Sequence, residues 1–218
     1  MQPKTVTKIF RYLSVAIPNP ITELVYNSPF ELLVAVILSA KTTDKIVNQV
    51  TKALFKKAST PHQLVALGEN GVSEIIKSVG FHRSKTKHLI NTSLILIARF
   101  KEKIPNTRAE LELLPGVGRK TANVLLNILF NQSTIAVDTH VFRVANRLGL
   151  ANSRNVKTVE NELNAIVPTK FGRQAGSLLL LHGRYTCKAL NPHCADCTLN
   201  QLCNYYTTTN AAAPASSR

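Results

Sequence analysis

Apolar side chains recur along this sequence at spacings of three and four residues, the period of an α-helix. Ile9, Tyr12, Leu13 and Ala16 form one such stripe. Further stripes predict helices over about 32–37, 46–54, 61–67, 72–78, 84–100, 108–114, 119–130, 138–149, 156–166 and 172–184. Prolines, which end helices, fall between these segments, at Pro18, Pro20, Pro29, Pro61, Pro105, Pro115 and Pro168. No two-residue alternation of the kind that marks strands appears, so the pattern predicts an all-α fold.

No segment has the length or composition of a membrane span. The longest uncharged apolar stretches, 32–40 and 93–98, are far shorter than the roughly 20 residues that a bilayer requires. The apolar run 9–17 contains Arg11 and lacks the pattern of a signal peptide. We therefore expect a soluble protein of the cytoplasm or nucleoid. The segment 207–218 is rich in Thr, Ala and Ser, and we expect it to be disordered.

The charge balance is the most unusual feature of the composition. The chain has 27 Lys and Arg against 12 Asp and Glu, a formal charge of +15. Such an excess predicts attraction to a polyanion, and nucleic acid is the most common one. The charge alone leaves open a basic protein that has no polyanionic ligand.

The segment 111–122 has the most specific local pattern. A helix should end near Leu114, Pro115 blocks its extension, and Gly116 and Gly118 allow positive φ in a tight turn. A new helix should begin near Arg119. The first amides of a helix have no intrahelical partners and lie at the positive end of its dipole, so they bind phosphate without reading base sequence.

Two other interpretations of this turn compete. A plain connector between helices would not require both glycines, whereas phosphate binding explains them. A nucleotide-binding P-loop needs G-x-x-x-x-G-K-[ST] after a strand, and here Arg119 occupies the position of the second glycine. The pattern therefore favours a DNA-binding helix–hairpin–helix.

Lys120 and Asp138 are the candidate catalytic pair. Taken separately, a lysine on a first helical turn is usually solvated or near phosphate, and an aspartate before Thr139 is usually a helix cap. Together they allow a specific mechanism. A free lysine has a pKa of about 10.4, and a positive helix end with nearby cations favours the neutral, nucleophilic amine. A carboxylate can stabilise a cationic sugar and handle protons.

All four cysteines fall near the C-terminus, in the pattern Cys187-x6-Cys194-x2-Cys197-x5-Cys203. In a reducing compartment such a cluster indicates metal binding rather than disulfides. The spacing matches neither the paired knuckles of most structural zinc sites nor the ferredoxin patterns. On ligand chemistry, zinc and a [4Fe-4S] cluster both remain open.

Three motifs in this order resemble the bacterial endonuclease III family of iron–sulfur DNA glycosylases. They are Leu114-Pro-Gly-Val-Gly-Arg-Lys-Thr-Ala-Asn, then Thr134-Ile-Ala-Val-Asp-Thr-His-Val-Phe-Arg-Val, then the cysteine pattern. Pro29-Phe-Glu-Leu-Leu and Leu38-Ser-Ala-Lys-Thr-Thr-Asp are similar as well, so the resemblance covers roughly residues 1–206.

The resemblance implies two helical domains with a DNA groove between them. A six-helix barrel domain would span 22–132 and hold the helix–hairpin–helix at 108–127. Residues 1–21 and 133–206 would form the second domain, which carries a [4Fe-4S] cluster in the loop 187–203, with Cys187, Cys194, Cys197 and Cys203 as ligands.

The resemblance also implies an activity and its residues. Lys120 would attack C1′ of a flipped-out nucleotide and form a Schiff base, the oxidised pyrimidine would leave, and β-elimination would cut the strand 3′ to the abasic site. Asp138 would be needed for base release. The partner would be double-stranded DNA with oxidised pyrimidines or abasic sites, bound by a monomer. The expected DNA-binding residues are Lys41, Phe81, Gly116, Val117, Gly118, Arg119 and Thr121.

Lys41 departs from the family pattern, which usually has glutamine there. Lysine only donates hydrogen bonds, whereas glutamine donates and accepts, so the preference for the base opposite the lesion should differ. We interpret His140, His182 and His193 as structural or surface residues. Arg143 and Arg147 share a helix face and could contact phosphate or be solvated.

Several other functions compete with this one. An adenine-mismatch glycosylase typically lacks the hairpin lysine, so Lys120 argues against it, whereas a photodimer glycosylase would keep it. A non-catalytic DNA-binding module with structural zinc, or an iron–sulfur electron carrier, would belong to different classes. The hairpin and the charge of +15 argue against the electron carrier.

Overall fold

The computed structural model describes residues 1–211, and this part of the chain is helical and contains no strand, which confirms the predicted all-α class. The chain divides into two compact units. One is Glu23–Phe130, and the other joins Met1–Thr22 to Asn131–Arg218. Within the described residues, no helix is long and apolar enough to cross a membrane.

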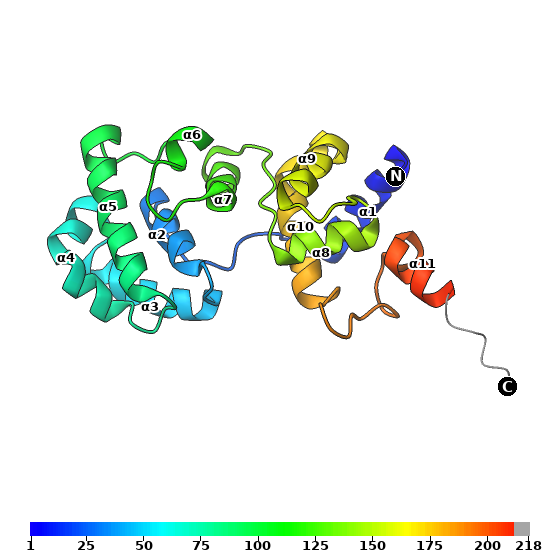
Figure 1. Ribbon diagram of the computed structural model, residues 1–218, viewed down its shortest axis with the longest axis horizontal. Coiled ribbons are helices and arrows are strands. Elements are labelled where there is room, and N and C mark those ends of the chain that lie inside the picture. The colour runs from blue at the N-terminus through cyan, green and yellow to red at the C-terminus, as the bar shows by residue number, and fades with distance from the viewer. Residues whose placement is uncertain (212–218) are drawn as a thin grey trace. The chain divides into compact units, whose positions relative to one another are not determined.

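The unit Glu23–Phe130 is built around one apolar helix. In α2 every residue from Phe30 to Leu38 is buried, as expected of a helix that is enclosed on all sides. It packs against α3, α5 and α7, and α4 packs against α5. The helices of this unit (Figure 1) are α2 (Pro29–Ser39), α3 (Asp44–Lys57), α4 (Pro61–Ile75), α5 (His82–Phe100), α6 (Arg108–Leu111) and α7 (Arg119–Phe130).

Side-chain caps fix where several of these helices begin. At α2 the Ser28 hydroxyl accepts a hydrogen bond from the Glu31 amide, and Glu31 in turn accepts one from the Asn27 amide. This arrangement is a variant of the capping box in which the carboxylate bonds the residue before the cap, and it satisfies the Glu31 amide, which the helix start leaves without a partner. In α4 the backbone is non-helical at Gly68, where φ is 70°, so the two helices predicted over 61–67 and 72–78 are joined at a kink.

The second unit packs α10 against both α1 and α8, while α9 and α11 contact α8 (Figure 1). Its core contains Val6, Ile9 and Leu13 from the first helix together with apolar residues after position 134. The sequence therefore returns to the N-terminal helix after an insertion. Its helices are α1 (Pro3–Ala16), α8 (Thr139–Leu148), α9 (Val156–Ile166), α10 (Gly172–Tyr185) and α11 (Asn204–Ala211), with short 3₁₀ turns η1 (Thr169–Phe171) and η2 (Asn200–Leu202).

The prediction of a disordered tail over 207–218 is wrong for its first part. Residues 207–211 belong to α11, which packs against α8. The hydroxyls of Thr207 and Thr208 donate back to the carbonyls of Cys203 and Asn204, so residues that usually favour loops are tied into the helix. Residues 212–218 lie outside the described part.

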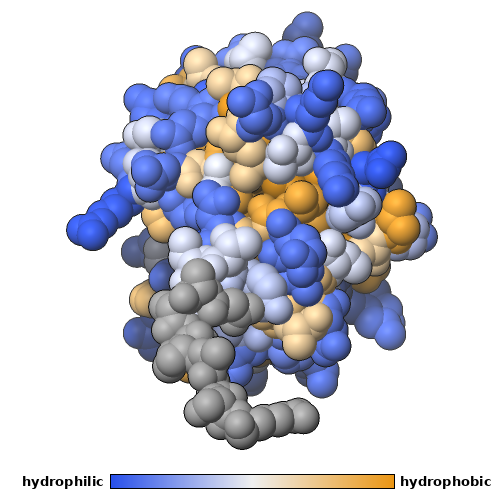
Figure 2. Space-filling view, turned by 90° about the vertical axis from the view of Figure 1, so that its right-hand side faces the viewer, coloured by the Kyte–Doolittle hydropathy of each residue, from blue (hydrophilic) through white to orange (hydrophobic). Residues whose placement is uncertain are grey.

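Hydrophilic side chains cover most of the face drawn in Figure 2, and hydrophobic residues occupy small areas between them. This distribution agrees with the large excess of Lys and Arg in the sequence. This face is therefore suited to contact with water and charged groups.

Candidate functional site: a helix–hairpin–helix and a cysteine pocket

The predicted hairpin connects α6 to α7. Gly116 has φ of +83°, a conformation that side chains rarely adopt. A Cβ at this position would lie 3.2 Å from Ile37 Cγ2 and 3.1 Å from Nδ1 of His88 on α5. The Thr92 hydroxyl, also on α5, donates to the Pro115 carbonyl at 2.9 Å. The turn is thus held against α5, and glycine is required at position 116 for both conformation and space.

Two details of the turn differ from the sequence-based prediction. Gly118 does not adopt positive φ. A Cβ there would meet no atom within 4 Å, so this glycine leaves an open approach to the backbone. Val117 is buried, and its amide donates to the Leu114 carbonyl at 2.9 Å, so it shapes the turn. Within the described residues, the exposed amides of Gly116 and Gly118 donate no hydrogen bond.

Lys120 is exposed on the first turn of α7, two residues after Gly118. Arg119 and Thr121 flank it and are half-buried. The helix start contains no acidic residue, so the positive end of the helix dipole is not offset by a carboxylate of its own first turn. The amine and the open amides of the turn therefore lie on one short segment that is suited to a phosphodiester.

Asp138 is the N-cap of α8, in the other unit. Its Oδ1 accepts hydrogen bonds from the amides of His140 and Val141, each at 2.9 Å. The carboxylate is half-buried. Gly183 on α10 lies so close that a Cβ there would be 2.9 Å from His140 Cβ, which fixes the start of α8 against α10. Asp138 is thus rigidly held, and it lies in a different unit from Lys120.

Lys41 and Phe81, the two residues expected to insert into DNA, share an unusual backbone state. Both have positive φ, 57° and 60°, although neither is glycine. Both are exposed, and Phe81 has 73% of its surface accessible. Their loops touch, because a Cβ at Gly80 would lie 3.3 Å from the Lys41 carbonyl. Exposed residues with a strained backbone conformation are typical of functional sites.

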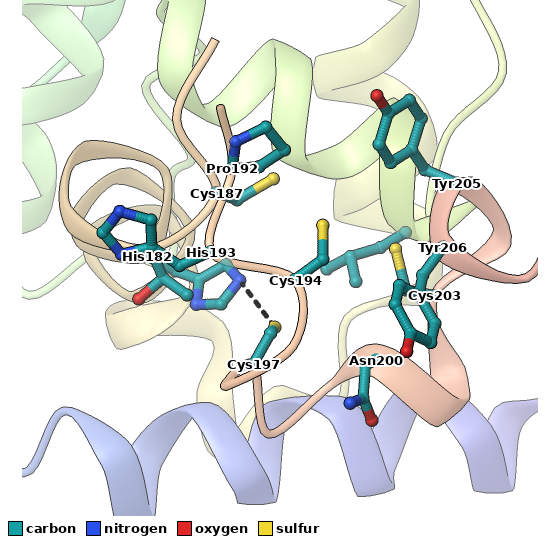
Figure 3. A pocket seen from close by; sticks show the side chains of 12 residues that line it. His182, Cys187, Pro192, His193, Cys194, Cys197, Asn200, Cys203, Tyr205 and Tyr206 are labelled. Atoms are coloured by element: carbon teal, nitrogen blue, oxygen red, sulfur yellow. Dashed lines mark hydrogen bonds between the residues drawn. The ribbon is translucent and has the colours of Figure 1, made fainter. Parts of the chain in front are cut away.

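The four cysteines line one pocket together with His182, His193 and residues of α8 and α11. In Figure 3 the sulfurs of Cys187, Cys194 and Cys203 extend from different parts of the loop into this space. Burial, and to a smaller extent the neighbouring cysteines, raise the pKa of the Cys197 and Cys203 thiols. Four clustered thiolates repel each other, so a bound cation would stabilise them. Within the described residues, no group of three or more His, Cys, Asp or Glu side chains lies close enough to hold a single metal ion.

Arg143 and Arg147 hold the cysteine loop, a role that the sequence analysis, which left phosphate contact and solvation open, did not predict. Arg143 donates to the carbonyls of Gly183 at 2.8 Å and Cys187 at 3.0 Å. Arg147 donates to the carbonyls of Lys188 at 2.7 Å and Ala189 at 3.1 Å, and its guanidinium lies over the ring of Tyr205. Most of their donors are therefore committed within the protein.

His182 is buried, and its Nε2 lies 3.7 Å from the Cys197 sulfur. Burial lowers the pKa of His182 to about 4, so its imidazole is neutral near pH 7. His140 contacts Arg143. The interpretation of His140 and His182 as structural residues is consistent with these contacts.

Lys85 is a residue of this region that the sequence analysis missed. Only 5% of it is accessible. Its ammonium donates to the carbonyls of Leu38 and Ala40 and to the Thr42 hydroxyl. Burial lowers the pKa of Lys85. The sequence did contain a clue, because Lys85 is four residues before Leu89 on the buried stripe of α5.

Comparison with known proteins defines the class of this fold and site. The family profile of the HhH-GPD superfamily of base excision DNA repair proteins matches residues 34–169. The chain therefore belongs to this superfamily.

Within the superfamily the chain belongs to the endonuclease III family and is a base excision repair enzyme. It is 52% identical to endonuclease III of Rickettsia conorii over 206 residues, covering 94% of this chain and 98% of the relative. It is 50% identical to endonuclease III of Escherichia coli over 188 residues, covering 86% and 89%. A solved endonuclease III trapped as a covalent intermediate with DNA matches it with a TM-score of 0.90, at 38% identity over 96% of this chain and 99% of the other.

Proposed function

We propose that this enzyme releases oxidised pyrimidines from double-stranded DNA and then cuts the strand 3′ to the abasic site, with Lys120 as the nucleophile. The observation that carries the proposal is the hairpin itself. An exposed lysine lies on the first turn of α7, two residues after Gly118, and the amides of the exposed Gly116 and Gly118 donate no hydrogen bond within the described residues. Phosphate bound at those amides would bring the sugar of a flipped nucleotide to the amine.

The proposed reaction requires the amine of Lys120 in its unprotonated form. Lys120 Nζ attacks C1′, the bond from C1′ to the base breaks, and the base leaves with the proton that the amine gives up. The C1′–O4′ bond of the sugar ring then breaks, O4′ takes up a proton, and a protonated Schiff base forms between C1′ and Nζ. The resulting Schiff base acidifies the hydrogen at C2′. Loss of that proton and departure of the 3′ phosphate complete the β-elimination, and water then releases the lysine.

Asp138 would act on the first of these steps. The cap hydrogen bonds from His140 and Val141 hold its carboxylate in one place. A fixed negative charge stabilises the cationic character that the sugar gains as the base departs. Both amide bonds use Oδ1, so this oxygen is already held in place before the substrate binds.

Lys41 and Phe81 would fill the gap that the flipped nucleotide leaves. Removing a base from the stack costs a few kcal/mol, and less when the base is damaged. An exposed aromatic ring and a lysine stem on touching loops can replace part of the lost stacking and pairing. Arg119 and Thr121 would add contacts to the backbone phosphates beside the hairpin.

Cys187, Cys194, Cys197 and Cys203 would hold a [4Fe-4S] cluster. The donor set fits such a group, because all four thiols line one space and the pocket contains no carboxylate. Bound, the cluster would cross-link residues 187–203 into a fixed loop. The cluster has no part in the Schiff-base steps. Because its substrate would be chromosomal DNA, we place the enzyme in the cytoplasm, with the nucleoid.

A duplex with one thymine glycol tests the proposed activity. We expect base release together with strand cleavage that needs no alkali, because the lyase step follows on the same lysine. Cleavage that appears only after alkali treatment would contradict the lyase. Cleavage of a pyrimidine photodimer in preference to thymine glycol would contradict the proposed lesion class.

A further inference from the structure

We propose that Lys85 is a positioning residue that holds the turn of one DNA-inserting side chain, Lys41, against the start of the helix that carries the other, Phe81. The inference rests on the proposed function, because insertion into DNA is part of it. The observation behind it is that the buried ammonium of Lys85 is bonded to the turn that carries Lys41, while Lys85 itself lies on the first turns of α5, whose N-cap is Phe81.

The side chain of Lys85 fixes the turn that carries Lys41. Its ammonium donates to Leu38 O at 2.8 Å, to the Ala40 carbonyl and to the Thr42 hydroxyl at 3.1 Å. Ala40 and Thr42 are the two neighbours of Lys41 in the chain. The ammonium therefore binds the backbone on both sides of Lys41, while Lys41 itself is exposed with φ of 57°.

The Lys85 ammonium lies at the end of α2, where backbone carbonyls lack hydrogen-bond donors within the helix. The last carbonyls of a helix have no intrahelical partners, and they carry the negative end of the dipole. The Thr42 amide closes the turn by donating to Ser39 at 3.1 Å. Lys85 supplies donors to the Leu38 and Ala40 carbonyls, so the chain can leave α2 at once in the strained conformation that presents Lys41.

The start of α5, the helix that carries Lys85, fixes the second loop. The amide of residue 85 donates to the Phe81 carbonyl at 3.0 Å, which is the first backbone bond of this helix. Phe81 is the N-cap of α5 and has no side-chain cap hydrogen bond, so this backbone bond anchors a residue that is 73% accessible. Gly80 then brings the two loops together at the Lys41 carbonyl.

A residue that only filled space in the core would not need a buried positive charge. Burying an ammonium is costly unless it is fully hydrogen-bonded, and a methionine of similar length would fill the same space without that cost. Two of the three acceptors, the Ala40 carbonyl and the Thr42 hydroxyl, belong to the turn that presents Lys41, and the third, the Leu38 carbonyl, lies at the end of α2 where that turn begins. The charge therefore acts on the turn.

The test compares two substrates in single-turnover experiments with the full enzyme. One is a duplex with thymine glycol, in which a paired base must be flipped out. The other is a single-stranded oligonucleotide with an abasic site, in which no base is flipped. The variants are Lys85→Met, Lys41→Ala and their combination. Lys87→Met is the matched control, because it removes an exposed lysine from the same helix.

We expect Lys85→Met to slow reaction of the duplex by about ten- to a hundredfold, as a small misplacement of working groups does. Cleavage of the single strand should change by less than about twofold, and Lys87→Met should resemble the wild type. The combined variant should be less impaired than the product of the two single effects, because the residues act as a unit. Equal loss on both substrates, or effects that multiply, would overturn the inference.

Thr42→Val covers the case in which Lys85→Met fails to fold. It keeps the side-chain shape and removes one acceptor of the ammonium. We expect a loss of about two- to tenfold on the duplex alone, the cost of one hydrogen bond, and unchanged duplex activity would overturn the inference. A wild-type enzyme that cuts neither substrate would overturn the proposed function, and this inference with it.

Discussion

Arg147 donates from Nη1 to the sulfur of Cys187 at 3.4 Å, and the same nitrogen binds the Lys188 carbonyl at 2.7 Å. A single guanidinium thus fixes the first cysteine of the loop and the residue that follows it. The arginine approaches from α8, so α8 connects the start of the cysteine loop with Asp138, its own N-cap. Mutations in α8 should therefore affect both the cysteine loop and the base-release reaction in which Asp138 is proposed to act.

Arg147→Met should loosen the cysteine loop. Loss of its hydrogen bonds removes about 1–3 kcal/mol from the folded loop, so we expect faster loss of iron in air and in chelator. Iron content and visible absorption over time measure this. Arg154→Met, which removes an exposed arginine nearby in the sequence, is the control. Equal rates of iron loss in both variants would show that Arg147 does not hold the loop.

The substitution Asp138→Asn removes the negative charge of this side chain but keeps its role as the N-cap of α8. Asparagine caps helices as well as aspartate does, so its Oδ1 can keep the bonds to His140 and Val141, and the thermal midpoint should stay close to that of the wild type. Base release should fall by about a hundredfold, because the negative charge is lost. Cleavage of a ready-made abasic site should fall much less. An asparagine variant that releases base at the wild-type rate would remove Asp138 from the chemistry.

Gly116→Ala and Gly118→Ala should fail in different ways. Alanine at 116 must adopt φ of +83° and crowd His88, so we expect a loss of about 1–2 kcal/mol in the free energy of unfolding. Alanine at 118 meets no atom, so stability should persist while the new methyl obstructs the phosphate. Denaturant unfolding and DNA binding, measured on both variants, check this. A Gly118→Ala variant with full DNA affinity would contradict the proposal that the backbone at Gly118 binds a DNA phosphate.

Lys41→Gln should alter the preference for the base opposite the lesion, since glutamine adds an acceptor that lysine lacks. The measurement is the ratio of base-release rates opposite guanine and opposite adenine. The ratio should change while cleavage of a single-stranded abasic site stays constant. The same ratio in both proteins would disprove the idea.

Helices and the hairpin could be predicted from the sequence because their causes are local. Apolar periodicity indicated α7 and α9 with their observed ends, and the proline and glycine at 115 and 116 marked the turn. The cysteine spacing likewise indicated that the four thiols belong to one site. Each of these inferences needed only neighbours within a few residues.

What the sequence did not reveal depends on partners far along the chain. Lys85 binds the end of α2, more than forty residues earlier, and Arg143 binds Cys187 at a similar separation. Periodicity cannot tell a basic side chain that points inward from one that is solvated. The helix at 207–211 was missed for the same reason, because contact with α8 supports a sequence of low helix propensity.

The most direct test of the central claim is borohydride trapping on duplex DNA with an abasic site, using wild-type enzyme, Lys120→Ala and Lys120→Arg. Borohydride reduces a Schiff base to a stable amine, so wild type should give a covalent protein–DNA adduct. Both variants should give none, although arginine keeps the positive charge and hence much of the DNA binding. No adduct from DNA-binding, iron-loaded wild-type protein, or an adduct that persists in Lys120→Ala, would contradict the assignment of Lys120 as the nucleophile.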